Sequence, residues 1–182
     1  MSDGATESGA THRLYQRVVG LIGCPGSDKT TYARRFDPLD GWVHLTLDDL
    51  QQAIWPPDRQ VYWQVRKGSL DEGARRVLHS VKEAALEAAL AASYNEVLAD
   101  THLIKAVFAR ELKIMSRYGI TIEWKLFNVP WDVLYVRNEE RNAVAPAHRQ
   151  PEYVLRLAYD AMCASDAWWR TLPPEQIETI LI

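Results

Sequence analysis

Short apolar runs alternate with helical patterns along most of this chain. Runs of the kind that form buried strands occupy five ranges: Arg17–Ile22, Val43–Leu47, Glu96–Asp100, Ile120–Phe127 and Glu178–Ile182. Between these runs, apolar residues recur at intervals of three and four, which predicts helices. Strands that alternate with helices favour a parallel sheet with helices packed on it. The pattern therefore predicts an α/β fold, with a parallel sheet of about five strands flanked by helices.

The longest predicted helix covers Ser69–Ser93, and Ser69 and Glu72 form a capping box at its start. Its apolar positions at helical spacing are Ala74, Val77, Leu78, Val81, Ala85 and Ala88. Shorter helices are predicted over Tyr32–Phe36, Leu50–Ile54, Lys105–Tyr118, Trp131–Asn142 and Glu152–Ala164. No repeat or linker divides the sequence. We expect a flexible tail over residues 1–12 and one domain over residues 13–182.

A glycine-rich loop between the first strand and a helix carries the most informative motif. The residues are Gly23, Cys24, Pro25, Gly26, Ser27, Asp28, Lys29, Thr30 and Thr31. Strand, glycine-rich loop and Lys-Thr at a helix start form the layout of a P-loop. In such a loop, backbone N–H groups surround the phosphates of a nucleotide. The lysine ammonium then binds the terminal phosphates, and the threonine hydroxyl reaches Mg²⁺. ATP and Mg²⁺ are therefore the expected cofactors.

One position departs from the P-loop pattern. Glycine usually precedes the lysine, whereas this chain has Asp28. A carboxylate there lies close to an anionic phosphate, which costs binding energy unless it turns outward or pairs with a cation. Two other interpretations stay open beside a working nucleotide loop. The segment is a structural strand-to-helix turn, or it is a loop that lost nucleotide binding through Asp28.

Composition and charge narrow the functional classes. The chain has 182 residues, a net charge of −3 and two cysteines, Cys24 and Cys163. An acidic balance argues against non-specific, high-affinity coating of nucleic acid, although it permits a local basic groove. We expect no transmembrane segment, because no run of 18 apolar residues occurs. Two thiols without an export signal indicate a cytoplasmic protein. The sequence leaves the oligomeric state open.

Aspartates follow the second and third predicted strands, where an open parallel sheet collects its functional groups. Asp48 is placed to accept the proton of an attacking hydroxyl, and Asp49 is placed to cap the next helix. Asp100 and Thr101 end the third strand, where a carboxylate that organises magnesium is common in P-loop proteins. These side chains predict phosphoryl transfer to an alcohol.

Two arginines, Arg137 and Arg141, lie four residues apart on one predicted helix and so share a face. Such a pair can fold over the phosphates of a bound nucleotide as a lid. Glu139 and Glu140 are interleaved with them, so an ordinary solvated helix face is the alternative interpretation.

Taken together, these motifs resemble the phage polynucleotide 5′-hydroxyl kinases. The resemblance rests on the loop, Asp48-Asp49, Asp100-Thr101, the stretch Trp124–Trp131 and Arg137 through Arg141, all in family order across about residues 17–160. It implies an adenylate-kinase-like core that transfers the γ-phosphate of ATP to a hydroxyl of DNA or RNA, and a phage protein in the host cytoplasm. By position, Lys29 and Thr30 bind phosphate and magnesium and Asp48 is the general base. Asp100 and Thr101 line the acceptor side, and Arg141 is the lid arginine.

The chain departs from this family at a second position. The family has an arginine three residues after the catalytic aspartate, where it clamps an acceptor phosphate, and this chain has Gln51. A neutral side chain cannot replace bidentate phosphate binding. The acceptor is therefore a terminal 5′-hydroxyl or, alternatively, the hydroxymethyl group of a modified base such as 5-hydroxymethyluracil. A kinase for nucleosides or other small molecules, and an impaired nucleotide-binding module, remain further alternatives.

Overall fold

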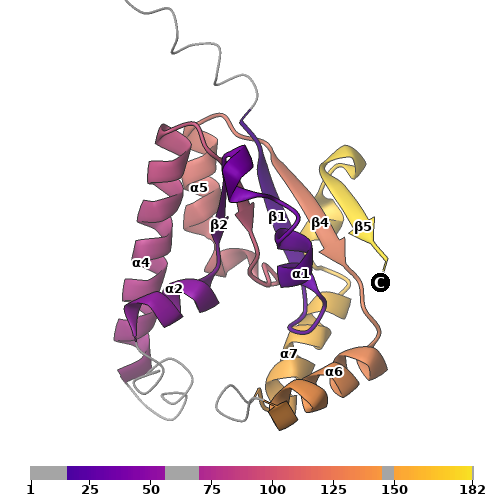
Figure 1. Ribbon diagram of the computed structural model, residues 1–182. Coiled ribbons are helices and arrows are strands. Elements are labelled where there is room, and N and C mark those ends of the chain that lie inside the picture. The colour runs from indigo at the N-terminus through magenta and orange to yellow at the C-terminus, as the bar shows by residue number, and fades with distance from the viewer. Residues whose placement is uncertain (1–15, 56–69, 145–149, 182) are drawn as a thin grey trace, which may run out of the picture.

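A five-stranded, all-parallel sheet forms the centre of the computed structural model, which describes residues 16–55, 70–144 and 150–181 (Figure 1). The strands are β1 (Val18–Gly23), β2 (Trp42–Leu45), β3 (Asn95–Leu98), β4 (Ile122–Phe127) and β5 (Ile177–Ile180). Their order in the sheet is β2-β3-β1-β4-β5, and every neighbouring pair is parallel. The predicted α/β fold with about five parallel strands is confirmed.

Six α-helices connect and flank these strands within the described ranges. They are α1 (Lys29–Ala33), α2 (Leu47–Ile54), α4 (Leu70–Ala91), α5 (Ala109–Arg117), α6 (Trp131–Val144) and α7 (Glu152–Cys163), with short 3₁₀ turns at Pro38–Asp40, Lys105–Val107, Trp168–Thr171 and Pro174–Gln176. The predicted second strand runs two residues too far, because the side chain of Thr46 accepts a hydrogen bond from Asp49 N and so starts α2 at Leu47. The predicted tail over residues 1–12 and the capping serine Ser69 lie outside the described residues.

The central strand β1 is buried along its whole length. Gly20 has a packing role there, because a Cβ at this position would lie 2.3 Å from the ring of Trp124 on β4. Trp124 is 3% exposed and joins an aromatic cluster with His102, Phe108 and Trp168. The aromatic packing therefore requires a glycine in the middle of the sheet.

The two faces of the sheet carry different cover. The larger cluster of buried apolar residues joins the sheet to α4, α5 and α7 through Leu86, Met115 and Leu155. The smaller cluster, on the other side, packs Ala33 of α1 with its neighbours Tyr32 and Phe36 against Val19, Leu21 and Phe127. No helix in the described part of the chain combines the length and apolar character needed to cross a membrane.

The buried stripe of α4 differs from the one its apolar spacing suggests. Val77 and Val81 are 49% and 38% exposed, whereas Leu78 and Leu86 are fully buried and Lys82 is 1% exposed. A lysine occupies the core face because carboxylates from the sheet and from α5 surround its ammonium group. Of the predicted apolar positions, Leu78 is buried but Val77 and Val81 are not, and apolar spacing gives no sign of the buried lysine.

Glu96 is a second ionisable residue inside this core. It lies on β3, is 0% exposed, and neither carboxyl oxygen has a hydrogen-bond partner among the described residues. Burial raises the pKa of Glu96 from 4.5 to about 8, although nearby Lys82 favours its ionised form. The folded protein therefore holds Glu96 protonated below that pH.

This pKa makes the stability depend on pH in a defined direction. A carboxyl with a higher pKa in the folded than in the unfolded state binds a proton more tightly when folded, so stability falls as pH rises from about 4.5 to about 8. We expect Glu96→Gln to be more stable than the wild type by about a few kcal/mol near pH 8.5 and by much less near pH 5. Urea unfolding at both pH values measures the difference. Glu140→Gln, an exposed change on α6, is the control, and equal pH dependence in Glu96→Gln and wild type would refute the buried-acid account.

Candidate functional site

The loop after β1 has a conformation suited to phosphate. Gly26 has φ +81°, a left-handed conformation that glycine adopts without strain. Lys29 begins α1 and is 7% exposed, and its ammonium donates to the carbonyl oxygens of Gly23 and Cys24 at 2.8 and 2.7 Å. Burial lowers the pKa of Lys29 to about 8, although Asp100 and Asp48 favour the charged form. An arriving phosphate strengthens the charged form further.

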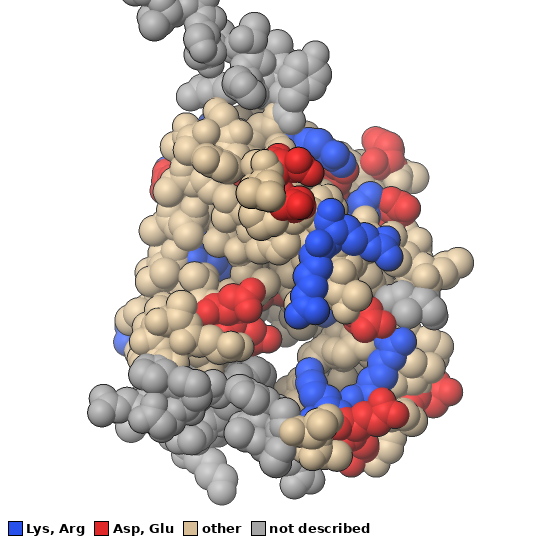
Figure 2. Space-filling view, viewed as in Figure 1, with Lys and Arg blue, Asp and Glu red and all other residues tan. Residues whose placement is uncertain are grey.

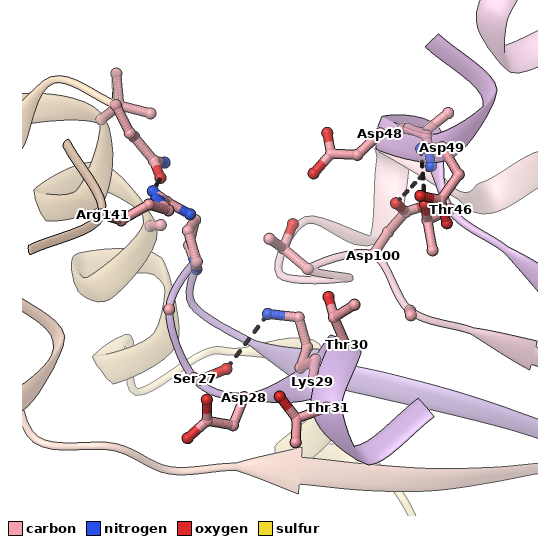
Figure 3. Close-up of a pocket in the computed structure, with 18 of the residues that line it drawn as sticks. Ser27, Asp28, Lys29, Thr30, Thr31, Thr46, Asp48, Asp49, Asp100 and Arg141 are labelled. Carbon is pink, nitrogen blue, oxygen red and sulfur yellow. Dashed lines mark hydrogen bonds between the residues drawn. The ribbon is translucent and has the colours of Figure 1, made fainter. Parts of the chain in front are cut away.

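Asp28 also lies in the left-handed region, with φ +62°. Aspartate tolerates this conformation better than most residues, although glycine adopts it freely. Its carboxylate turns away from Asp48 and Asp100 (Figure 3) and pairs with Arg137 of α6 at 2.9 Å. Arg137 also donates to Gly26 O at 3.2 Å. The departure from the glycine pattern is thus accommodated by backbone geometry and by a cation from α6.

Asp48 is placed by the start of α2. Thr46 caps the helix by accepting from Asp49 N at 3.0 Å, and Asp100 at the end of β3 accepts from Leu47 N at 2.9 Å. Asp48 lies in the first turn of α2, exposed to water within the cleft that faces the loop (Figure 3). Crowding by protein atoms, together with Asp100 and Asp49, raises the pKa of Asp48, although Arg141 and Lys29 favour its ionised form.

Both oxygens of Asp100 are engaged by the protein. Oδ1 accepts from Leu47 N, and Oδ2 contacts Lys82 Nζ at 2.6 Å. Lys82 also contacts Glu111 of α5 at 2.7 Å, so one buried ammonium joins two carboxylates. Burial would raise the pKa of Asp100, but Lys82, His102 and the Leu47 N–H together lower it. Asp100 is therefore ionised and serves to hold the start of α2 in place.

Arg141 comes from α6 on the opposite side of the cleft (Figure 3). Its guanidinium donates to Asn138 Oδ1 at 3.0 Å and to Gln150 Oε1 at 2.5 Å. Gln150 is 5% exposed, and its backbone carbonyl accepts from both Asn138 and Asn142. These bonds connect the end of α6 to Gln150, two residues before α7, and hold Arg141 toward the cleft.

A cleft of about 570 Å³ lies between these elements. Its described lining includes Pro25, Gly26, Ser27, Asp28, Lys29, Thr30, Thr31, Asp48, Asp49, Asp100, Thr101 and Arg141. Figure 2 shows it as a hollow with acidic side chains over α2 on one side and both basic and acidic side chains over α6 on the other. The structure thus brings together most of the residues predicted from the sequence.

Three predicted site residues lie outside this lining. Gly23 ends β1 beneath the loop, where a Cβ would lie 2.7 Å from Ser27 Oγ. Arg137 contacts the outside of the loop through Asp28 and Gly26. Gln51 is 2% exposed, with Oε1 buried and unpartnered within the described structure, and its neighbour Gln52 lines the cleft instead.

The cleft fits a nucleotide bound with magnesium. The open loop and buried Lys29 present the donors that a triphosphate needs, and the exposed Thr30 hydroxyl faces the same space. Among the described residues, no group of three or more His, Cys, Asp or Glu could hold a metal ion. Mg²⁺ at such sites takes only one or two protein ligands and completes its shell with phosphate oxygens and water. Thr30 would be the residue that holds it.

Sequence reasoning missed Lys82, Glu111 and Gln150. Lys82 and Glu111 occupy helical positions where a charged residue ordinarily faces water. Gln150 lies between two predicted helices and carries no motif. A charged residue on the buried face of a helix cannot be recognised from the sequence alone, because its partners come from other elements of the fold.

Replacing Asp28 and Arg137 separately and together tests the ion pair. We expect Arg137→Ala to weaken ATP binding about three- to tenfold, because the Asp28 carboxylate then lies near the phosphates without its paired cation. The scale is typical of partly exposed pairs. Asp28→Asn keeps the backbone conformation and removes the charge, so the double variant should regain the ATP affinity of Asp28→Asn alone. Calorimetry gives the four dissociation constants. A double variant as weak as Arg137→Ala would instead indicate that Arg137 contacts the phosphates directly.

Comparison with known proteins agrees with this geometry. The AAA domain family AAA_33 matches residues 18–165. A putative kinase from Chloroflexus aurantiacus is similar in structure, with a TM-score of 0.62 and 16% identity over 91% of this chain and 84% of that chain. A chain of the Pnkp1/Rnl/Hen1 complex has a TM-score of 0.53 and 23% identity over 68% of this chain. A chain of the PezAT chromosomal toxin–antitoxin system of Streptococcus pneumoniae has a TM-score of 0.55 and 19% identity over 72% of this chain.

These likenesses are of fold, because all three identities are low. The match spans only 39% of the chain from the Pnkp1/Rnl/Hen1 complex and 56% of the chain from the PezAT system. The parallel sheet, the phosphate-binding loop and the match over residues 18–165 together show that this chain belongs to the AAA_33 family of AAA domains, with a P-loop kinase fold.

Proposed function

We propose that this protein is an ATP-dependent polynucleotide kinase that transfers the γ-phosphate to a terminal 5′-hydroxyl of DNA or RNA. One observation carries the proposal. The Asp48 carboxylate, the Lys29 loop and Arg141 line the same cleft from three different sides (Figure 3). A base, a phosphate-binding loop and an arginine around one space are the parts that phosphoryl transfer needs.

Asp48 is the general base in this scheme. Its carboxylate accepts the proton of the 5′-hydroxyl while the hydroxyl oxygen forms a bond to the γ-phosphorus. The bond from that phosphorus to the β,γ-bridging oxygen breaks, and ADP leaves with the electron pair. The raised pKa of Asp48 makes its carboxylate a stronger base than an ordinary one.

Cations offset the charge that develops on the transferred group. Lys29 would exchange its contacts with the Gly23 and Cys24 carbonyls for phosphate oxygens. Arg141 would exchange its contact with the neutral Gln150 side chain for the moving phosphoryl group, since a guanidinium binds phosphate more strongly than an amide oxygen. Magnesium, when bound with ATP, supplies further charge neutralisation at the β- and γ-phosphates.

The nucleic-acid acceptor is supported by the order and spacing of the motifs, which resemble phage polynucleotide kinases throughout residues 17–160. One observation favours a second candidate, a DNA kinase for a hydroxymethylated base. The position of the family's clamp arginine holds Gln51, which is buried, and α2 contains no Lys or Arg. An acceptor with a phosphate on the 3′ side then loses one contact.

Asp48→Asn tests the proposal most sharply, because it removes the base and keeps the shape. We expect transfer from γ-labelled ATP to a 5′-hydroxyl oligonucleotide to fall by about 10²–10⁴-fold, the usual contribution of a general base, while ATP affinity changes little. Asp49→Asn is the matched control, since it alters the adjacent exposed carboxylate of the same helix, and its loss should stay below about tenfold.

Four acceptors distinguish the candidate substrates. Two are DNA and RNA with a 5′-hydroxyl end. The third is DNA whose ends carry 5′-phosphate and which contains internal 5-hydroxymethyluracil, and the fourth is a free nucleoside. Label on the 5′-hydroxyl ends alone supports the polynucleotide kinase. Label on the modified internal base supports the second candidate. Absence of label on every acceptor, or full activity in Asp48→Asn, would contradict the proposed function.

A further inference from the structure

A second cavity adjoins the cleft on the side away from the phosphate-binding loop. It has a volume of about 260 Å³ and shares Leu47, Asp100, Thr101, Val154 and Ala158 with the cleft. Its remaining described wall comes from the segment after β3, from α4 and α5, and from α7. Leu47 lines both spaces and directly precedes Asp48, so it connects the cavity to the part of the cleft that holds the carboxylate proposed to activate the acceptor.

The wall and mouth of this cavity are mostly apolar. Leu103 and Phe108 lie within the wall and are 8% and 3% exposed. Ile104, Val107 and Leu157 also line the cavity, and they are 58%, 56% and 65% exposed. Large aliphatic side chains that gather unburied around a concave site are typical of ligand binding.

The charges in the wall are already paired with one another. Lys82 is the one Lys or Arg in the described lining, and it contacts both Asp100 and Glu111. Burial acts to lower the pKa of Lys82, but the two carboxylates outweigh it and raise the pKa, so the ammonium stays charged. A phosphate or carboxylate in this cavity would meet two carboxylates and no unengaged lysine or arginine of the described wall. An uncharged group suits the cavity better.

His102 adds one polar feature to this wall. Its Nδ1 lies 2.7 Å from the Leu21 carbonyl oxygen, which can only accept, so Nδ1 carries the proton. Nε2 is buried without a hydrogen-bond partner in the described structure and lies 3.9 Å from Glu111 Oε2, too far for a hydrogen bond. The wall therefore combines apolar surface with one unpartnered polar atom.

We propose that this cavity binds the base of the 5′-terminal nucleotide, so that the protein recognises the end of a strand by its first base. The inference rests on the proposed function, because it places the terminal hydroxyl at Asp48. A nucleobase is uncharged, has apolar faces that pack against aliphatic and aromatic side chains, and carries hydrogen-bonding groups at its edge that can reach an unpartnered polar atom. Because the cavity and the cleft share part of their lining, one nucleotide can place its base in the cavity and its 5′-hydroxyl in the cleft.

The test compares two 5′-hydroxyl oligonucleotides that differ only at the first residue, one with its base and one abasic. We expect the wild type to phosphorylate the abasic end with kcat/KM lowered about tenfold, mainly through KM, a loss on the scale of contact with one base. Ala161→Phe enlarges a side chain of the cavity wall, and it should reduce this preference to below about threefold. Leu157→Ala should weaken use of the normal end several-fold.

Tyr153→Ala is the matched control for Leu157→Ala. Tyr153 is 59% exposed one turn earlier on α7 and is not part of the described cavity lining, so this variant should act like wild type. ATP affinity and melting temperature report whether each variant is folded, and the wild-type comparison stands without any variant.

The possible outcomes separate the two proposals. Equal use of normal and abasic ends by an active wild type overturns the base site and leaves the kinase standing. Base-dependent phosphorylation of free nucleosides, with oligonucleotides poor, supports the base site and overturns the strand-end acceptor. No transfer to any acceptor overturns both.

Discussion

The carboxylate of Asp100 is the constraint on which the site depends. One oxygen accepts from Leu47 N and the other contacts Lys82, so the end of β3, the start of α2 and the middle of α4 are joined at one side chain. Because Asp48 is the next residue after Leu47, this junction sets where the proposed base lies relative to the loop of Lys29. Breaking a buried charge pair on one side leaves an uncompensated charge, which is far more costly than losing a surface pair.

The phosphate-binding loop shows how a residue that departs from a motif can be accommodated without changing the backbone conformation that the motif requires. The position before Lys29 has a left-handed backbone, which explains why glycine is usual there. Aspartate accepts that conformation, and Arg137 neutralises the carboxylate from α6. The geometry argues against a loop disabled by Asp28. It also makes α6 part of the loop, because the same helix supplies Arg137 outside and Arg141 inside the cleft.

Much of this architecture follows from the sequence, because strands and loops are specified locally. The apolar runs gave all five strands, and the spacing of the loop gave Lys29 and Thr30. The aspartate at the start of α2 could be placed in the cleft because parallel strands end at one edge. The core face of α4 could not be predicted, since Lys82 is buried by partners from other elements. The orientation of Gln51 and the contacts of Gln150 likewise depend on tertiary packing.

The central claim is that the Lys29 loop binds a triphosphate independently of the acceptor chemistry at Asp48. Calorimetric titration of the protein with ATP and magnesium tests it directly. The account predicts one binding site that is retained in Asp48→Asn and lost, or weakened by at least about tenfold, in Lys29→Met, since that change removes the buried ammonium. Absence of binding by the wild type, or undiminished binding by Lys29→Met, would contradict it.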